Sequence, residues 1–305
     1  MSIVQDIRST FNRRDNALMQ LIWLNVLVFA SLILLKFILK FSSAIGYYPT
    51  VMTQVQVSSA LPVLLRHPWT LLTYAFTHEE FFHILFNMLN LYWFGQLVRE
   101  YLGDRRLVSI YILGALAGAV FFLLTYNFVP AFQNALGSPT PMVGASAAVT
   151  AIIVAGATLL PDYTFMLILI GPVKIKWIAA VVVLISLAGV NGGNPGGEIA
   201  HLGGALLGFV FIRQLQAGRD LGRPVQAVGN WFIRLTSRRP TMRVSSSQRR
   251  PEPVAASASS PARKPAAPGQ PIQDEIDTIL DKISRSGYES LSKDEKQKLF
   301  RASQQ

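Results

Sequence analysis

The chain has 305 residues, of which 51% are hydrophobic and only 15% are charged. Soluble globular domains combine a similar apolar share with about 25% charged residues, so this composition excludes an ordinary soluble protein. The absence of cysteine excludes disulfides, thiolate metal ligands and a cysteine nucleophile. The formal net charge is +11, and the Lys and Arg residues lie beside apolar segments and in the C-terminal tail rather than on an aromatic-rich face. We therefore expect no nucleic acid partner.

The first 16 residues form a polar leader with a helical pattern. Ile3, Ile7 and Phe11 recur at helical spacing beside arginines, as in an amphipathic helix at the cytoplasmic face of a membrane. A disordered leader is the alternative. Residues 17–39 then form an apolar segment longer than the core of a signal peptide, and we interpret this segment as an uncleaved membrane anchor.

Six apolar segments have lengths close to the roughly 20 residues that a helix needs to cross a bilayer. They cover residues 17–39, 81–98, 107–127, 145–160, 175–190 and 198–215. Between the fourth and fifth segments, Pro161 and the pair Gly171-Pro172 interrupt an apolar run, which predicts a hairpin or extended piece at the membrane face. We therefore expect an all-α polytopic membrane protein whose six-helix bundle covers residues 17–215.

The basic residues alternate between the loops in a way that indicates orientation. Lys and Arg cluster in the leader, between the second and third segments, before the fifth and after the sixth, whereas loops 128–142 and 191–198 contain none. The positive-inside rule then predicts that both termini face the cytoplasm, and we expect a bacterial inner membrane. Lys36, Lys40 and Arg66 in the first loop are exceptions to this pattern.

The C-terminal part of the chain differs from the membrane segments. Residues 216–271 are basic and then rich in Pro, Ala and Ser, a composition that predicts a disordered linker. Residues 272–305 place isoleucines on one helical face, with a helix stop at Gly287 and a capping box at Ser292 and Glu295. This pattern predicts a small cytoplasmic helical hairpin, which either docks to a partner or to the membrane face, or forms a weak self-contained unit.

Polar side chains at the starts of three membrane segments are candidates for function, because burying them in a bilayer is costly. His83 and Asn87 lie four residues apart at the start of the second segment and share one helix face. Ser146 follows Gly144 at the start of the fourth segment, and His201 lies at the start of the sixth. Even-numbered helices run in the same direction, so we expect these residues to meet at one depth.

Each candidate also has a purely structural interpretation. His83 and Asn87 can tie helices together by hydrogen bonds, and a lone serine often only bonds back to its own helix. Small residues repeated every fourth position would, however, let the fourth and sixth helices approach closely enough for His201 to activate Ser146 as a nucleophile. These residues are Ala147, Ala151 and Ala155 in the fourth segment and Ala200, Gly204 and Gly208 in the sixth.

The histidines do not form a recognisable metal site. His78 and His83 are five residues apart, so this segment lacks the HExxH spacing of zinc proteases. Two histidines also leave the coordination of zinc incomplete. We therefore expect neither a metal ion nor a cofactor.

Together, these residues resemble the rhomboid family of intramembrane serine proteases over roughly residues 17–215. The resemblance rests on the HxxxN of His83 and Asn87, the GxS of Gly144 and Ser146, and the AHxxGxxxG that contains His201. It implies a dyad of Ser146 and His201 without an acidic third member, and an oxyanion hole from His83, Asn87 and the Ser146 N–H. The implied substrates are membrane proteins with a transmembrane segment in the lipid bilayer, cleaved near the outer face.

Three positions depart from the family's pattern. Ala147 replaces a glycine after the nucleophile, Thr150 stands where an aromatic ring often supports the histidine, and Trp69-Thr70 replaces a Trp-Arg pair in the first outer loop. Two other functions therefore stay open. One is an inactive rhomboid-like protein that binds or chaperones membrane proteins, and the other is a small transporter with a proton relay through its membrane histidines.

Overall fold

The computed structural model describes residues 16–133, 139–167, 170–236 and 271–302. Contacts divide the chain into two units, residues 1–240 and residues 241–305. The amphipathic helix expected in the leader lies, apart from Asn16, outside the described residues. The same holds for the Pro-, Ala- and Ser-rich part of the expected linker.

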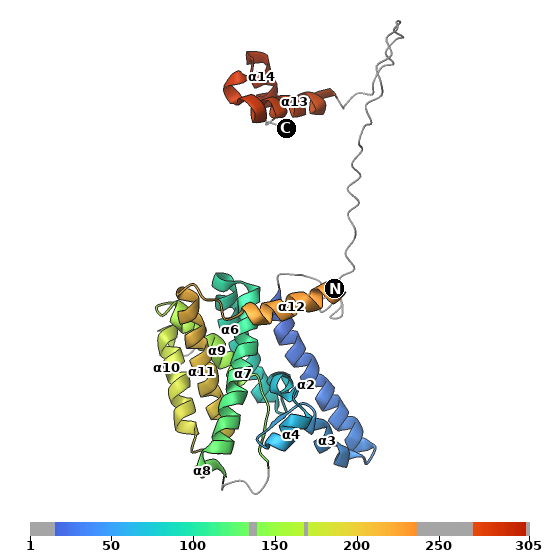
Figure 1. Cartoon of the computed structure of the whole chain (residues 1–305), viewed down its shortest axis with the longest axis vertical. Coiled ribbons are helices and arrows are strands. Elements are labelled where there is room, and N and C mark those ends of the chain that lie inside the picture. Colours follow the sequence, from blue (N-terminus) through green and yellow to red (C-terminus); the bar gives the residue numbers. More distant parts are fainter. Residues whose placement is uncertain (1–15, 134–138, 168–169, 237–270, 303–305) are drawn as a thin grey trace. The chain divides into compact units, whose positions relative to one another are not determined.

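Six apolar helices make up most of the first unit, and they coincide with the six segments expected from the sequence (Figure 1). Among the described residues, α2, α7 and α11 are long and apolar enough to cross a membrane, and α9 and α10 are shorter apolar helices. The protein is therefore a multi-pass integral membrane protein. The six helices are α2 (Ala17–Phe41), α6 (Phe81–Leu102), α7 (Asp104–Phe128), α9 (Ser146–Leu159), α10 (Ile175–Gly189) and α11 (Pro195–Gln216).

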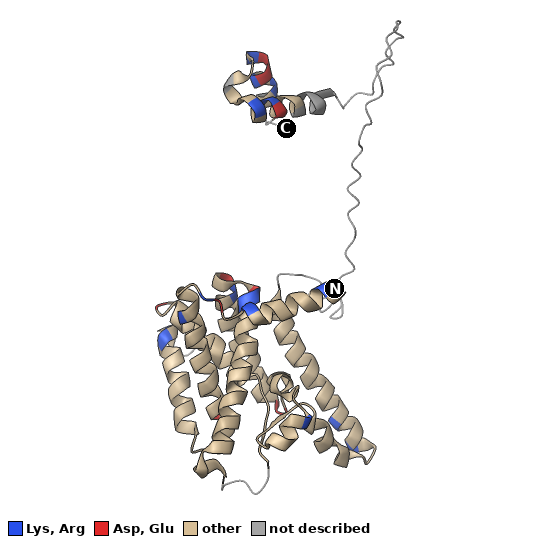
Figure 2. Ribbon diagram, viewed as in Figure 1, with Lys and Arg blue, Asp and Glu red and all other residues tan. Residues whose placement is uncertain are grey.

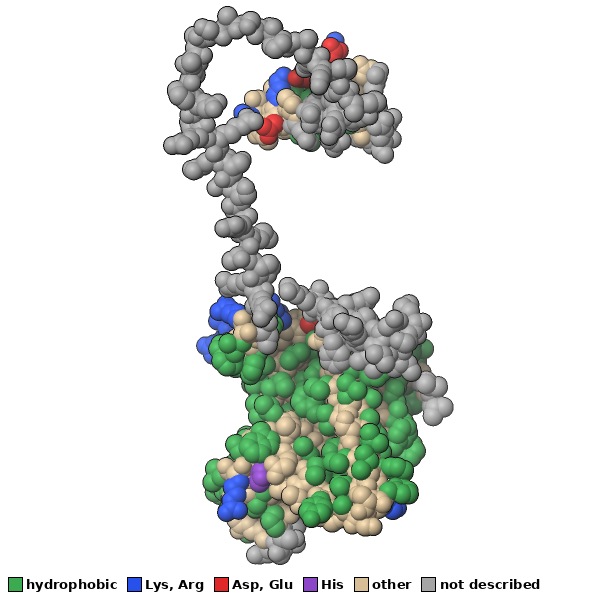
Figure 3. Space-filling view, turned by 90° about the vertical axis from the view of Figure 1, so that its right-hand side faces the viewer, with side chains coloured by type: hydrophobic (Ala, Val, Ile, Leu, Met, Phe, Trp, Pro, Cys, Tyr) green, Lys and Arg blue, Asp and Glu red, His purple; other side chains and the backbone are tan. Residues whose placement is uncertain are grey.

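The outer surface of this unit is apolar. Figure 3 shows hydrophobic side chains over most of one face, and Figure 2 shows that charged side chains gather near the ends of the bundle. On α10, Trp177, Leu184 and Ile185 are each at least 60% exposed. Apolar surface of this extent is typical of contact with lipid.

Helix α9 lies at the centre of the bundle and contacts α6, α7, α10 and α11. Ten of its 14 residues are buried. A Cβ atom at Gly204 or Gly208 of α11 would overlap the backbone carbonyl oxygens of Ala147 and Ala151. The close packing that the repeated small residues predict for α9 and α11 is therefore confirmed, and it depends on glycines that let the two backbones touch.

Short elements carry the chain from α2 to α6. Trp69 Nε1 donates a hydrogen bond to the carbonyl oxygen of Gln54 at 2.8 Å, and Thr70 Oγ1 donates to that of His67 at 2.7 Å, so this loop is anchored without an arginine at position 70. Strand β1 pairs with β2 and ties the loop to the segment that leads into α9. The elements are η1 (Ile45–Tyr47), α3 (Tyr48–Thr53), β1 (Val57–Ser58), α4 (Leu61–Arg66), α5 (Thr70–Thr73), η2 (Tyr74–Phe76), α8 (Pro130–Gln133) and β2 (Pro141–Met142).

The apolar run between α9 and α10 forms a hairpin, as the sequence predicts. Strand β3 (Thr164–Leu167) pairs antiparallel with β4 (Gly171–Lys174). At its base, the ammonium groups of Lys176 and Lys174 lie 2.8 and 2.9 Å from Asp162 Oδ1 and lower the pKa of this exposed carboxyl to about 2. The hairpin thus ends on charged groups that suit a membrane surface.

The prediction of a disordered linker from residue 216 onward is wrong for its first part, because residues there form helix α12 (Arg223–Thr236). An ion pair of 3.1 Å between Arg106 and Asp220 fixes the turn that leads from α11 into α12, and α12 contacts α7. The sequence of α12 has apolar residues at helical spacing, but its basic and polar composition led to the prediction of a linker. Such an amphipathic helix suits a membrane surface. Its apolar face carries Val228, Trp231, Phe232 and Leu235, each more than half exposed.

The second unit contains the helical hairpin expected from the sequence, formed by α13 (Pro271–Ser286), η3 (Tyr288–Ser290) and α14 (Lys293–Ala302). Gly287 ends α13 with a φ of 77°, in the left-handed region that favours glycine. The N–H of Ser292 donates to Glu295 Oε2 at 2.7 Å, and the N–H of Glu295 donates to Ser292 Oγ at 3.3 Å. The predicted capping box is therefore confirmed.

We expect α14 to lose stability in acid. The N–H of Ser292 and the ammonium of Lys282, 2.9 Å away, lower the pKa of the Glu295 carboxyl from 4.5 to about 2. Because the pKa is depressed in the folded state, this stabilisation is complete above pH 4.5 and is lost as the pH falls toward 2. Amide protection factors of residues 293–302 in the full chain measure the loss.

The variant Glu295→Gln is the control for this prediction. Its α14 should be less protected than the wild type at neutral pH and should depend less on pH in the acid range. Equal protection of wild type and variant throughout would contradict the assignment to Glu295.

Candidate active site

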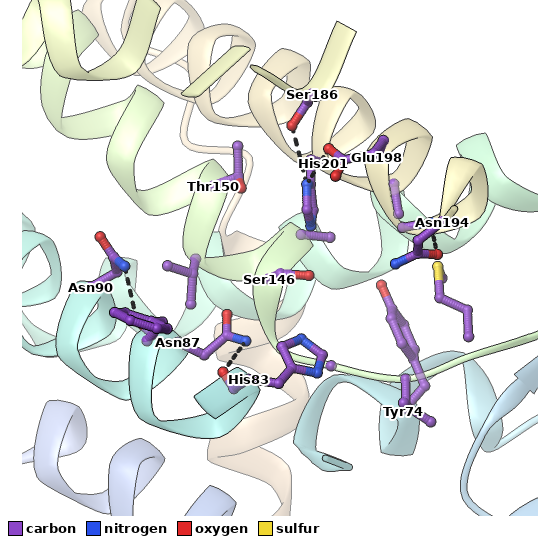
Figure 4. A pocket seen from close by; sticks show the side chains of 18 of the residues that line it. Tyr74, His83, Asn87, Asn90, Ser146, Thr150, Ser186, Asn194, Glu198 and His201 are labelled. Atoms are coloured by element: carbon purple, nitrogen blue, oxygen red, sulfur yellow. Dashed lines mark hydrogen bonds and ion pairs between the residues drawn. The ribbon is translucent and has the colours of Figure 1, made fainter. Parts of the chain in front are cut away.

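A cavity of about 670 Å³ lies among the first turns of α6, α9 and α11. It brings together all five site residues expected from the sequence, namely His83, Asn87, Gly144, Ser146 and His201. Figure 4 shows these helices and α10 contributing side chains that point toward the same space. Among the residues that the structure describes, no Lys or Arg lines the cavity. Further lining residues include Tyr74, Glu79, Glu80, Ser186, Asn194 and Glu198.

Ser146 is the first residue of α9, and glycine shapes the turn before it. Gly144 has a φ of 122°, which side chains rarely allow, and a Cβ there would lie 2.6 Å from Cε1 of His83. The N–H of Gly144 donates to the carbonyl oxygen of Tyr74 at 2.9 Å. The first N–H groups of a helix have no partner within it, so the Ser146 N–H is available as a donor at the cavity.

His78 supports this turn from outside the cavity. Its side chain is almost fully buried, its Nε2 accepts the N–H of Ala145 at 3.3 Å, and its ring lies edge-on to that of His83 with 5.0 Å between centroids. Within the described residues, no group of three His, Cys, Asp or Glu is placed to hold a metal ion. The hydrogen bond to Ala145 lets His78 hold the segment before Ser146.

The imidazole of His201 has two partners, both on Nδ1. Ser186 Oγ of α10 and Glu198 Oε2, three residues earlier on α11, each lie 3.1 Å from this nitrogen. The resemblance implied a dyad without an acidic third member. The carboxylate of Glu198 nevertheless contacts the histidine, and the dyad stays a prediction.

No hydrogen bond joins Ser146 to His201 in the described part of the chain, although the sequence predicted that the two side chains would meet. Both line the cavity, and Figure 4 shows them on neighbouring helices with the His201 ring beside the Ser146 side chain. Hydrogen bonds between catalytic groups commonly tighten only when a substrate binds. The arrangement therefore suits activation of Ser146 by His201 once a bound substrate brings the two side chains closer together.

Asn87 and His83 lie across the cavity from His201 (Figure 4). Asn87 Nδ2 donates one hydrogen to the carbonyl oxygen of His83 at 2.9 Å, which orients its amide. An amide group carries two N–H donors, so the second hydrogen is left for the cavity. Together with the Ser146 N–H, this group meets the requirement for preorganised donors around an oxyanion.

Two departures from the family's pattern are accommodated in the structure. A Cβ at Gly118 of α7 would lie only 2.5 Å from the Cβ of Ala147, so Ala147 fits because Gly118 has no side chain. Thr150 is buried and lines the cavity without a ring. Support for His201 comes instead from Ser186 and Glu198.

The residues that sequence reasoning missed are Glu198 and Ser186. Glu198 had a detectable signal, since it lies at i−3 from His201 and such pairs meet on a helix. Beyond Lys176 at its start, α10 is apolar except for Ser186, which marks this serine as a candidate inside a membrane. The contact of Ser186 with the same nitrogen of His201 depends on the packing of α10 against α11. The spacing of residues along the sequence does not reveal this packing.

The structure is thus a helical membrane bundle in which a serine, a histidine and the side-chain amide of Asn87 share one cavity. Residues 65–216 match the family model described as the Rhomboid domain. The chain belongs to the rhomboid family, a family of intramembrane proteases. Residues 271–305, which include the α13–α14 hairpin, match a family of unknown function (DUF6576).

The chain is also similar in sequence to three curated rhomboid-like proteins. RHOMBOID-like protein 12, mitochondrial, of Arabidopsis thaliana is 34% identical over 49% of this chain and 47% of its own length. Rhomboid protein 1, mitochondrial, of Saccharomyces cerevisiae is 29% identical over 52% and 45%. Rhomboid-like protein 16, chloroplastic, of Arabidopsis thaliana is 30% identical over 49% and 50%. The chain thus spans about half the length of the curated relatives it matches.

Proposed function

We propose that the protein is an intramembrane serine endopeptidase that cleaves transmembrane segments of membrane proteins. The observation that supports this most is that Ser146 and His201 share one cavity with the amide of Asn87 and the ring of His83. All four lie within the first two turns of helices that begin around that cavity. Membership of the rhomboid family supports the same class of reaction.

In the proposed reaction, the Ser146 hydroxyl attacks the scissile carbonyl carbon and His201 Nε2 accepts its proton. The carbonyl oxygen becomes an oxyanion, which the Ser146 N–H, Asn87 Nδ2 and His83 stabilise. The carbon–nitrogen bond then breaks, and His201 returns the proton to the leaving amine. Water, activated by His201, hydrolyses the acyl-enzyme and leaves a new carboxyl terminus.

The side of the cavity toward the lipid supports a membrane-embedded substrate. Phe82 and Phe86 of α6 and Ile185 of α10 line the cavity, and each is at least 60% exposed. The cavity is therefore continuous with the lipid-facing surface between α6 and α10. We propose that a transmembrane segment of the substrate reaches Ser146 along this apolar side.

Replacing Asn87 by alanine should reduce kcat by about 10² to 10³, with KM little changed, because the oxyanion loses a donor that acts in the transition state. Asn90→Ala is the matched control, since Asn90 Nδ2 makes the same kind of bond to its own helix, to Phe86 O at 2.8 Å. We expect the control to stay within a few-fold of wild type. Equal losses in both variants would point to helix stability instead of oxyanion binding.

A fluorophosphonate probe tests the nucleophile directly, because it reacts with activated serines. We expect labelling at Ser146 in the wild type and none in His201→Ala. The alternative is an inactive rhomboid-like binding protein, which the missing hydrogen bond between Ser146 and His201 favours. A folded wild type that the probe never labels would support that alternative.

We also propose that both termini face the cytoplasmic, positively charged side. Loops 128–142 and 191–198 contain no Lys or Arg, whereas Arg213, Arg219 and Arg223 follow the core of α11. The names of the relatives place them in mitochondria and chloroplasts and give no support to a bacterial inner membrane. A cytoplasmic partner of the α13–α14 hairpin stays a prediction.

A further inference from the structure

We propose that α12 docks on anionic lipid. Its apolar face enters the bilayer interface beside the bundle, and its arginines bind the negatively charged headgroups around that face. The occupant of this surface is therefore the membrane itself. Among the described residues that line the cavity, none belongs to α12, so lipid binding here does not depend on the proposed protease activity.

Helix α12 is fixed at the level where α11 leaves the membrane. Helix α11 is long and apolar enough to cross a bilayer, and only six residues separate its end from the start of α12. In this turn, Asp220 pairs with Arg106 of α7. Gly222 packs so closely on α7 that a Cβ there would lie 2.7 Å from Ser109 Oγ. Figure 1 shows α12 lying across the end of the bundle at which α7 begins, so the helix lies in the plane of the membrane surface.

The apolar face of α12 is largely exposed. Each of its four side chains is more than half exposed, although the helix contacts α7. The rings of Trp231 and Phe232 lie with 4.9 Å between their centroids and form the bulkiest part of this face. Tryptophan is enriched at the boundary between headgroups and acyl chains, because its apolar ring and its polar N–H suit the two sides of that boundary. This face therefore fits a bilayer interface better than water.

The charge around α12 is positive. Residues 213–236 contain four arginines and one acidic residue, Asp220, whose carboxylate is already paired with Arg106. At about 100° per residue, Arg223 and Arg234 lie within about 20° of one another, on the face opposite the apolar one. Both are exposed, and a guanidinium binds phosphate oxygens through a planar fork of donors. The complement of an apolar face flanked by arginines is a bilayer interface with negative headgroups.

The depth of each face of α12 can be measured with single labels, because the chain contains no cysteine. The full chain carries a fluorophore at Val228→Cys or at Asn230→Cys in vesicles of phosphatidylcholine and phosphatidylglycerol. We expect acrylamide, a neutral quencher in the water, to reach the label at position 230 and not the label at position 228. Asn230 is the matched control, since it is exposed on the polar face of the same helix.

Two outcomes of this measurement would overturn docking on lipid. One is equal quenching at the two positions. The other is shielding of position 228 that disappears when the protein is diluted with more lipid, because a second copy of the chain would then be the occupant.

Energy transfer tests which headgroup the arginines bind. The donor is the label at Asn230→Cys, and the acceptor is on the acyl chains of phosphatidylglycerol or of phosphatidylcholine. We expect stronger transfer to phosphatidylglycerol, with a difference that shrinks as salt is added. A basic residue near an anionic surface strengthens binding by about fivefold, so Arg223→Gln with Arg234→Gln should lower the preference by up to about 25-fold.

Lys40→Gln with Arg66→Gln is the matched control, because it removes the same charge from exposed residues of the first loop. This control should keep the preference of the wild type. Arg223→Lys with Arg234→Lys should keep most of it, because the charges remain. A wild type without preference for phosphatidylglycerol, or equal losses in the two glutamine variants, would overturn the binding of anionic lipid by α12.

Discussion

Replacing Ser146 by alanine is expected to abolish cleavage of a membrane-anchored substrate, with a loss of at least about 10⁴-fold in kcat. The hydroxyl is the only group proposed to form a covalent bond with the substrate, and the donors that remain around the oxyanion stabilise a state that no longer forms. Substrate binding should persist, because Ser146 occupies a small part of a cavity of about 670 Å³. The measurement is single-turnover cleavage by purified protein in bilayers.

Thr158→Ala is the matched control for the nucleophile. Thr158 is a hydroxyl residue of the same helix, and its Oγ1 donates to the carbonyl oxygen of Val154 at 2.7 Å, at the opposite end of α9 from the cavity. The control should cleave at a rate close to wild type. If Ser146→Ala cleaved within about tenfold of wild type, Ser146 would not be the nucleophile.

Replacing Gly204 by alanine is expected to remove both stability and activity. The added Cβ would overlap the carbonyl oxygen of Ala147, a backbone atom that cannot move without shifting the start of α9. Overpacking of this kind costs about 1–3 kcal/mol or more. Because Ala147 follows Ser146 directly, the shift would also move the nucleophile away from His201, so cleavage should fall further than the folded fraction does.

Gly229→Ala separates this clash from helix propensity. Gly229 also lies within a helix, but no atom lies within 4 Å of a Cβ built there. Both substitutions gain the propensity of alanine, roughly 1 kcal/mol, so Gly229→Ala should be neutral or slightly stabilising. Equilibrium unfolding in mixed micelles compares the two, and a Gly204→Ala protein as stable as Gly229→Ala would contradict the packing between α9 and α11.

The sequence was sufficient for the features that depend on local pattern. The six spans follow from the lengths of apolar segments, and the capping box at Ser292 and Glu295 is visible in the residues themselves. The approach of α9 to α11 was also predictable, because glycine and alanine repeated with the same period are needed only where two backbones meet.

Other features depend on tertiary contacts that no local pattern contains. Val57 pairs with Met142, which lies 85 positions further along the chain, and the two strands have only two residues each, too few to leave an alternating pattern.

Helix α12 was not predicted because the charged residues of this segment obscured the helical spacing of its apolar residues. The contact between Glu198 and His201 was missed for a different reason: the family resemblance implied that no acid was needed there.

The starts of α6, α9 and α11 around one cavity have an electrostatic consequence. Each helix directs the positive end of its dipole toward the cavity, whose lining includes the acidic side chains of Glu79, Glu80 and Glu198 and, among the described residues, no lysine or arginine. In the proposed protease the helix ends favour the oxyanion and the carboxylate that each cleavage leaves on the N-terminal fragment, whereas the acidic side chains in the lining disfavour that carboxylate. The balance between these two effects sets how fast that fragment departs into the lipid, and its departure becomes part of turnover.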